Sequence, residues 1–425
     1  MRAGATTGRR SSASKPRPPT GRSGLQLVVP ARSRFAAIRR AIDSVPTSQA
    51  ILVTVAWLCG VGLVMVLAAS AFASLATYGS VWAIFERQII WIAVGCIALV
   101  VALRIDPSTW RKYRVVMMLG VLVLLLAVLV PGIGVRAGGS SRWIGFGQLR
   151  VQPSELMKFA FAVFGADLVA RRSERYRHAK EVVGPLCLVL AGVALLVLIQ
   201  PDMGTAVVLC CIGLGMLVAS GVEMGAILKL LGALGVLAVL VALVDPYRRE
   251  RLLSFMDPLA HRNGSGYQVV QSLVGLGAGH LTGVGIGAGH QTWGLLPNAQ
   301  TDFIFSVIGE QTGLLGALLV LASFTVLAWL GLRVAREAPN RFESILAVGI
   351  TCWLVSQAFI NVGAVIGLLP VTGIPLPFVS FGGSALVVEM AGAGVLARIA
   401  SPHRRSGGRS QRAGRIGTGV HAHRS

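Results

Sequence analysis

The stretch LLPNAQTDFIFSVIGE, Leu295–Glu310, marks the point where a long polar connection enters a membrane-length helix. It places one acid, Asp302, directly before the apolar run Phe303–Phe305. A carboxylate at that position loses hydration unless a group binds or protonates it, so an acid at membrane depth is a functional-site candidate. The alternative is a buried structural acid that neighbouring groups satisfy.

The composition is that of an integral membrane protein. Of 425 residues, 54% are hydrophobic and 13% charged, and the mean hydropathy is +0.72. We therefore expect an all-α membrane fold of about ten transmembrane helices, each built on a run of roughly 20 apolar residues. A long extracellular loop, 245–302, separates the seventh and eighth helices. The predicted spans are 49–71, 86–104, 115–131, 153–170, 182–200, 203–220, 226–244, 303–332, 345–367 and 381–399.

The net charge of +22 is concentrated at the two ends of the chain. Residues 1–44 hold ten Lys and Arg against one acid, and residues 401–425 hold six Arg and no acid. We expect residues 1–48 and 401–425 to be disordered cytoplasmic tails that are drawn to anionic membrane lipids, flanking a membrane domain at 49–400. Basic residues in the even-numbered connections support this orientation. Nucleic-acid binding is the weaker interpretation, because aromatic residues are scarce among these cations.

Three polar residues lie at the ends of the third and fifth connections or just after them. Glu155 and Lys158 lie one turn apart after Pro153, so they can pair, either as an ion pair that locks the bundle or as ligand contacts. Asp202 is better explained as the cap of the next helix than as a chemical group.

Three connections have distinctive compositions. Residues 131–152 are rich in Gly and Ser and predict an external turn-rich loop, with Trp143 at the interface. The glycines of 275–290 have a spacing like GxGxxG, but no βαβ unit surrounds them, so we expect them to let non-helical backbone lie against protein or a water-filled cavity at membrane depth. Three prolines in 368–380 predict an extended packing segment.

Several separated motifs occur in a fixed order. They are RWIGFG with QPSELMK, QPDMGTA, YRRERLLSFMDP with GSGYQ, LLPNAQTDFIFSVIGE, and GLLPVTGIPLPFVSFGGS. Over roughly residues 50–400 this set resembles the SEDS family (shape, elongation, division and sporulation). The segments GLVMVLAAS and VWAIFERQIIW are more similar to its division-type than to its elongation-type members.

The resemblance implies a peptidoglycan glycosyltransferase of the bacterial cytoplasmic membrane that polymerises lipid II on the outer face, at the division septum. It also implies a class B penicillin-binding protein (an FtsI-like transpeptidase) and other divisome proteins as partners. The family's essential aspartate corresponds to Asp302. Because a hydroxyl is a weak nucleophile, a positioned base contributes about 10²–10⁴-fold. We expect an inverting reaction with Asp302 as general base and undecaprenyl pyrophosphate as the leaving group.

Substrate contacts are predicted around this acid. External arginines are candidates for stabilising the pyrophosphate, although each one alone is better explained as a headgroup anchor. A Mg²⁺ or Mn²⁺ ion can bridge the pyrophosphate, but no dedicated metal-ligand cluster is present in the sequence, and no protein metal site is predicted. The candidate substrate-binding residues are Arg142, Trp143, Glu155, Lys158, Arg248, Arg249, Arg251, Gln300, Thr301, Ser380 and Ser384.

Some positions depart from the family pattern. Gln300 stands where a histidine is usual, and His261 and Arg262 replace a second Asp-Pro pair. Glu389 stands where an apolar residue is usual, without a physical explanation from sequence. The alternatives are an elongation-type polymerase, a lipid II flippase or a divisome scaffold without activity. A flippase is disfavoured because no second copy of any motif is found.

Overall fold

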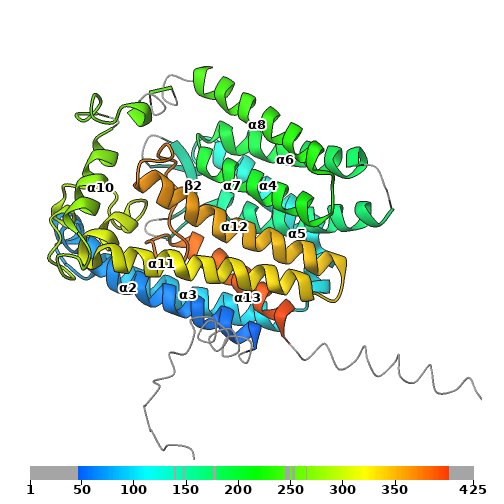
Figure 1. The fold of residues 1–425 in the computed structure, drawn as a ribbon, viewed down its shortest axis with the longest axis horizontal. Helices are drawn as coiled ribbons and strands as arrows, with labels where there is room; N and C mark the ends of the chain where they lie inside the picture. Colours follow the sequence, from blue (N-terminus) through cyan, green and yellow to red (C-terminus); the bar gives the residue numbers. More distant parts are fainter. Residues whose placement is uncertain are drawn as a thin grey trace, which may run out of the picture. The chain divides into compact units, whose positions relative to one another are not determined.

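The computed structural model describes residues 46–137, 140–146, 149–175, 179–244, 249–250, 254–264 and 266–401. The predicted tails at 1–48 and 401–425 lie almost wholly outside these ranges, so their disorder stays a prediction. The described residues form one compact unit, a layered bundle of helices (Figure 1).

A helix is present at each of the ten predicted spans. These helices are α2 (Thr47–Tyr78), α3 (Ala83–Arg104), α4 (Pro107–Leu129), α5 (Pro153–Arg175), α6 (Ala179–Ile199), α7 (Met203–Ala219), α8 (Met224–Val244), α11 (Ile304–Glu337), α12 (Arg341–Val365) and α13 (Ser384–Ala400). By length and composition, six of them can cross a membrane, namely α2, α3, α4, α6, α11 and α12. The count of ten crossings stays a prediction, since α7 and α13 have only 17 residues.

The third connection differs from the predicted loop. It contains a three-stranded antiparallel sheet, with β1 (Gly134–Ala137), β2 (Ser140–Phe146) and β3 (Leu149–Val151) in the order β1-β2-β3. Val135 pairs with Trp143, and Ile144 pairs with Val151. β-branched and aromatic residues suit such pairs, whereas the glycines and serines obscured them in the sequence. The all-α prediction is wrong in this detail, and β3 leads directly into α5.

Helix α12 lies at the centre of the bundle. Of its most apolar 18 residues, 78% are buried, against 17% for the peripheral helices α3 and α4. α12 packs against α11, α7 and α5, while α13 packs against α3 and α2 (Figure 1). Small residues allow this close packing: a Cβ atom on Gly331 would come within 2.0 Å of Thr351 Oγ1.

The connection predicted as one long loop, 245–302, contains further helices. α10 covers Tyr267–Ala278, and a 3₁₀ turn covers Gln291–Trp293. Between them, the glycine-rich backbone pairs with α11 where Gly313, at φ +69°, interrupts that helix: Leu314 N–H donates to His280 O at 3.0 Å. The prediction that these glycines bring non-helical backbone against protein is confirmed, since a Cβ on Gly283 would lie 2.2 Å from Gln311 O.

Candidate functional site

Asp302 lies in a turn immediately before α11. Asn298 takes a left-handed conformation, φ +58°, and its carbonyl accepts from the N–H groups of Thr301 and Phe303 at 3.1 and 3.3 Å. Asparagine tolerates this conformation better than most residues. Phe303 is buried as α11 begins, whereas Asp302 is partly exposed. The carboxylate therefore stands at a helix N-terminus, where negative charge is stabilised, and remains accessible.

The proline-rich loop, residues 368–380, holds the backbone of this turn. Ser380 Oγ donates to Thr301 O at 2.6 Å, and Phe381 N–H donates to Gln300 O at 2.9 Å. Four predicted site residues therefore lie together, namely Gln300, Thr301, Asp302 and Ser380. The acceptors of both bonds are main-chain carbonyls, so the side chain of Gln300 takes no part in them.

Asn361 of α12 connects the turn at Asp302 with the proline-rich loop. Its Nδ2 donates to Asp302 O at 2.7 Å and to Ile374 O at 2.8 Å. Gly373 faces the acid: a Cβ atom placed on it would lie 3.6 Å from Asp302 Oδ2. The loop therefore forms one wall of the space beside the carboxylate.

Glu389 of α13 holds the proline-rich loop at Phe378. Its Oε2 accepts from Phe378 N–H at 3.1 Å, and its Oε1 accepts from Gln357 Nε2 at 2.8 Å. Phe378 has φ +63°, a costly conformation for a bulky residue that persists only where the surroundings over-determine it. The acid that had no explanation from sequence thus anchors a strained segment next to Asp302.

Glu155 and Lys158 form the predicted ion pair, with Lys158 Nζ 2.6 Å from Glu155 Oε2 and both residues buried. Lys158 also donates to Gln357 Oε1 at 2.7 Å, and Gln357 donates to Pro375 O at 3.1 Å. The pair is therefore connected to the proline-rich loop through one amide. This arrangement fits the structural interpretation, while ligand contact stays a prediction.

Asp202 caps α7 as predicted, because its Oδ1 accepts from Thr205 N–H at 3.2 Å. It also does more than a cap: its Oδ2 accepts from Ser154 Oγ at 2.8 Å and from Gln152 Nε2 at 3.0 Å. Ser384, at the start of α13, accepts from Gln152 N–H at 3.1 Å. The first turns of α5, α7 and α13 therefore meet in one polar cluster.

The structure describes some of the predicted arginines and Trp143, but not all of these residues. Arg142 Nε donates to Gln200 O at 2.9 Å, and its guanidinium also donates to Pro201 O, so part of its donors hold the turn before α7. Arg249 is exposed. Arg248 and Arg251 lie outside the described residues. Trp143 is half-buried in β2. Pyrophosphate binding by any of these residues stays a prediction.

Sequence reasoning missed Gln357 and Asn361, which contact both sides of the proline-rich loop. A signal was available: two amides spaced four residues apart share one face of a mostly apolar helix. Glu310, the last residue of the stretch Leu295–Glu310, also has a structural role. It is buried and accepts from His290 N–H at 2.7 Å, so it holds the glycine-rich segment.

Within the described ranges, no group of three or more His, Cys, Asp or Glu side chains could hold a metal ion. Mg²⁺ is commonly held by one or two carboxylates together with substrate phosphates, so the oxygens of a pyrophosphate would have to supply most of the ligands beside Asp302. The bridging cation stays a prediction.

Comparisons with known proteins agree over most of the chain. A probable peptidoglycan glycosyltransferase FtsW of Geobacter metallireducens is 40% identical over 83% of this chain and 93% of its own length. Stage V sporulation protein E of Bacillus subtilis is 36% identical over 80% and 93%.

Solved structures share the fold. One chain of a structure described as "Structural coordination of polymerization and crosslinking by a peptidoglycan synthase complex" matches with a TM-score of 0.69 and 25% identity, over 84% of this chain and 98% of that one. The rod shape determining protein RodA of Thermus thermophilus matches with a TM-score of 0.61 and 24% identity, over 82% and 95%. The family model described as "Cell cycle protein", of FtsW, RodA and SpoVE, matches residues 49–405, and this chain belongs to that family.

Proposed function

We propose that this chain is a peptidoglycan glycosyltransferase that polymerises lipid II into glycan strands during septal cell-wall synthesis. The relatives named above support the class of reaction. The observation that carries the proposal is the position of Asp302, a partly exposed carboxylate whose backbone is held by the proline-rich loop and by Asn361. That arrangement suits a base, which must keep a fixed position and remain reachable by substrate.

In the proposed reaction Asp302 accepts the proton of the acceptor's 4-hydroxyl group. The oxygen forms a bond to the anomeric carbon of the lipid-linked chain, and the bond from that carbon to the pyrophosphate breaks. A one-step displacement inverts the configuration and releases undecaprenyl pyrophosphate. The general-base contribution is about 10²–10⁴-fold.

The negative charge that develops on the pyrophosphate needs cationic partners. Arg142 retains donors beyond those used on Gln200 and Pro201, because a guanidinium carries five N–H groups. Arg249 is exposed and is a second candidate.

The proposed setting is the bacterial cytoplasmic membrane at the division septum. Both termini face the cytoplasm and Asp302 faces the outside, in keeping with basic residues in the even-numbered connections. A class B penicillin-binding protein of the FtsI-like type is the proposed partner, since a solved relative belongs to a complex that coordinates polymerization and crosslinking. An elongation-type role is the second candidate, because RodA shares the fold.

The test is polymerisation of lipid II by purified protein, with and without a cognate class B penicillin-binding protein. Wild type is compared with Asp302→Asn, which keeps size and hydrogen bonding but removes the base. We expect glycan strands from wild type and at least about 100-fold less product from the variant. A folded variant that polymerises as fast as wild type would assign Asp302 a structural role. Absence of polymer from wild type with its partner present would favour a flippase or a scaffold.

A further inference from the structure

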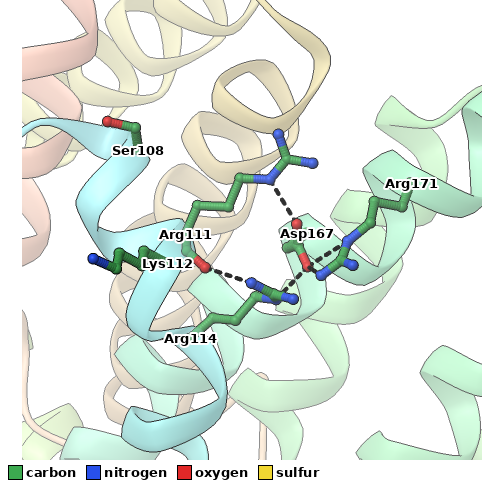
Figure 2. Close-up of a pocket in the computed structure, with 6 residues that line it drawn as sticks. All are labelled: Ser108, Arg111, Lys112, Arg114, Asp167 and Arg171. Atoms are coloured by element: carbon green, nitrogen blue, oxygen red, sulfur yellow. Dashed lines mark hydrogen bonds and ion pairs between the residues drawn. The ribbon is translucent and has the colours of Figure 1, made fainter.

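A second polar site lies at the other end of α5. A pocket of about 340 Å³ opens between the first turns of α4 and the last turns of α5 (Figure 2). Along a helix that rises about 1.5 Å per residue, Arg171 is roughly 24 Å from Glu155, so this pocket is distant from the candidate catalytic site. The residues that line it, here called the basic pocket, are Ser108, Arg111, Lys112, Arg114, Asp167 and Arg171.

One buried carboxylate faces three guanidinium groups in the basic pocket. Arg111 Nε is 2.7 Å from Asp167 Oδ1, Arg114 Nε is 2.5 Å from Oδ2, and Arg171 Nε is 2.8 Å from Oδ2. Figure 2 shows the three arginines converging on Asp167 while the amine of Lys112 points away from it. A single arginine would neutralise Asp167, so the pocket carries three further positive charges.

The arginines also have donors to spare. Each guanidinium carries five N–H groups, and the carboxylate engages only part of them. The side chains of Arg111 and Arg171 are 41% and 52% exposed, so they are open to a ligand as well as to Asp167. The basic pocket is therefore built for an anion.

An apolar face of α4 begins one turn away from this charge. Val116, Leu119 and Val123 are 68%, 57% and 63% exposed, and their spacing places them on one side of the helix. Tyr113, half-exposed between the pocket and this face, is a residue type common at the membrane interface. An occupant with an anionic head and apolar chains would match both surfaces.

We propose that the basic pocket binds the phosphate of an anionic phospholipid headgroup, with the acyl chains along Val116, Leu119 and Val123. Phosphate matches guanidinium groups because it accepts paired, charge-assisted hydrogen bonds. Basic pockets between transmembrane helices bind such headgroups in this way. A soluble phosphate shares the head chemistry but gains nothing from the apolar face of α4.

The experiment uses the full chain in detergent micelles and follows thermal unfolding by tryptophan fluorescence. Phosphatidylglycerol, phosphatidylcholine and inorganic phosphate are titrated separately. The variant Lys112→Gln/Arg171→Gln removes two pocket charges and leaves Arg111 and Arg114 on Asp167. The control Arg333→Gln/Arg336→Gln removes two charges from the last turns of α11. Lys112→Gln alone serves if the double variant unfolds.

We expect phosphatidylglycerol to stabilise wild type and the control equally. In the pocket variant, the phosphatidylglycerol concentration that gives half of the full stabilisation should be about tenfold higher. The charged tails are the same in all three proteins and do not affect the comparison. Equal midpoints in the pocket variant and the control would overturn the proposal. Equal binding of phosphatidylcholine would also overturn it. If inorganic phosphate stabilised the protein at the same concentration as phosphatidylglycerol, the pocket would bind free phosphate rather than a lipid headgroup.

Discussion

Ser380 Oγ donates a 2.6 Å hydrogen bond to the carbonyl oxygen of Thr301, 79 residues earlier in the chain. The same hydroxyl accepts from Leu376 N–H at 2.8 Å. One small side chain therefore fixes the proline-rich loop internally and ties it to the residue before Asp302. Because both partners are main-chain groups in a mostly buried setting, neither can easily find a replacement.

Ser380→Ala should lower both stability and the rate of lipid II polymerisation. It leaves Leu376 N–H and Thr301 C=O without their partner, at about 1–3 kcal/mol for each group that stays buried. We expect at least a tenfold lower rate in purified protein. The matched control is Ser323→Ala, whose hydroxyl bonds only to Leu319 O within its own helix. If the two substitutions lowered stability and the polymerisation rate equally, Ser380 would have no particular role in positioning Asp302.

Gly373→Ala tests the space beside the proposed base. Gly373 and Gly367 have the same φ of +73°, so alanine at either position costs about 1–2 kcal/mol of backbone strain. Only at Gly373 would the new methyl group face Asp302, whereas at Gly367 it would meet Val269 and Leu273. We expect similar losses in thermal stability, but a clear loss of polymerisation only for Gly373→Ala. Full activity of that variant would place the acceptor hydroxyl elsewhere.

The positions of the helices followed from the sequence because long apolar runs are a local signal. The start of a helix just after Asp302 and the cap at Asp202 were equally local signals. Contacts between distant segments were not predictable in the same way. Nothing around Glu389 in the chain indicates that Phe378 N–H and Gln357 will meet it, since those partners are brought to it by the packing of α12 and α13.

The small sheet and the break in α11 were not predicted from the sequence, for a related reason. The strands of residues 134–151 are short and contain glycine and serine, which locally favour turns. Gly313 follows Glu310-Gln311-Thr312 within a span, 303–332, that the sequence predicts as one continuous helix. Only the docking of the glycine-rich segment shows why α11 is interrupted there, because Gly313 contacts the backbone of Leu281 and Gly283.

Lys158→Met should strongly destabilise the protein, because it leaves the buried Glu155 without its cation. Removing one member of a buried ion pair typically costs about 3–5 kcal/mol. Adding Glu155→Gln removes the stranded charge, so we expect the double variant to unfold at a higher temperature than Lys158→Met alone. Thermal unfolding in detergent measures both. If the two effects simply add, the pair contributes no coupling and the ion pair is incidental.

Gly279→Ala should separate α10 from α11. A Cβ atom on Gly279 would lie 1.9 Å from Gly309 O, and because that contact is backbone, neither side can yield without moving a helix. We expect a loss of about 1–3 kcal/mol, or no folded protein. The control lies two residues away: Gly277 has nothing within 4 Å of its Cβ position, and alanine there should stabilise α10 by up to about 1 kcal/mol. Thermal unfolding of the two variants in the same detergent decides the matter. Equal stability would mean that α10 does not rest on α11 as closely as these two glycines require.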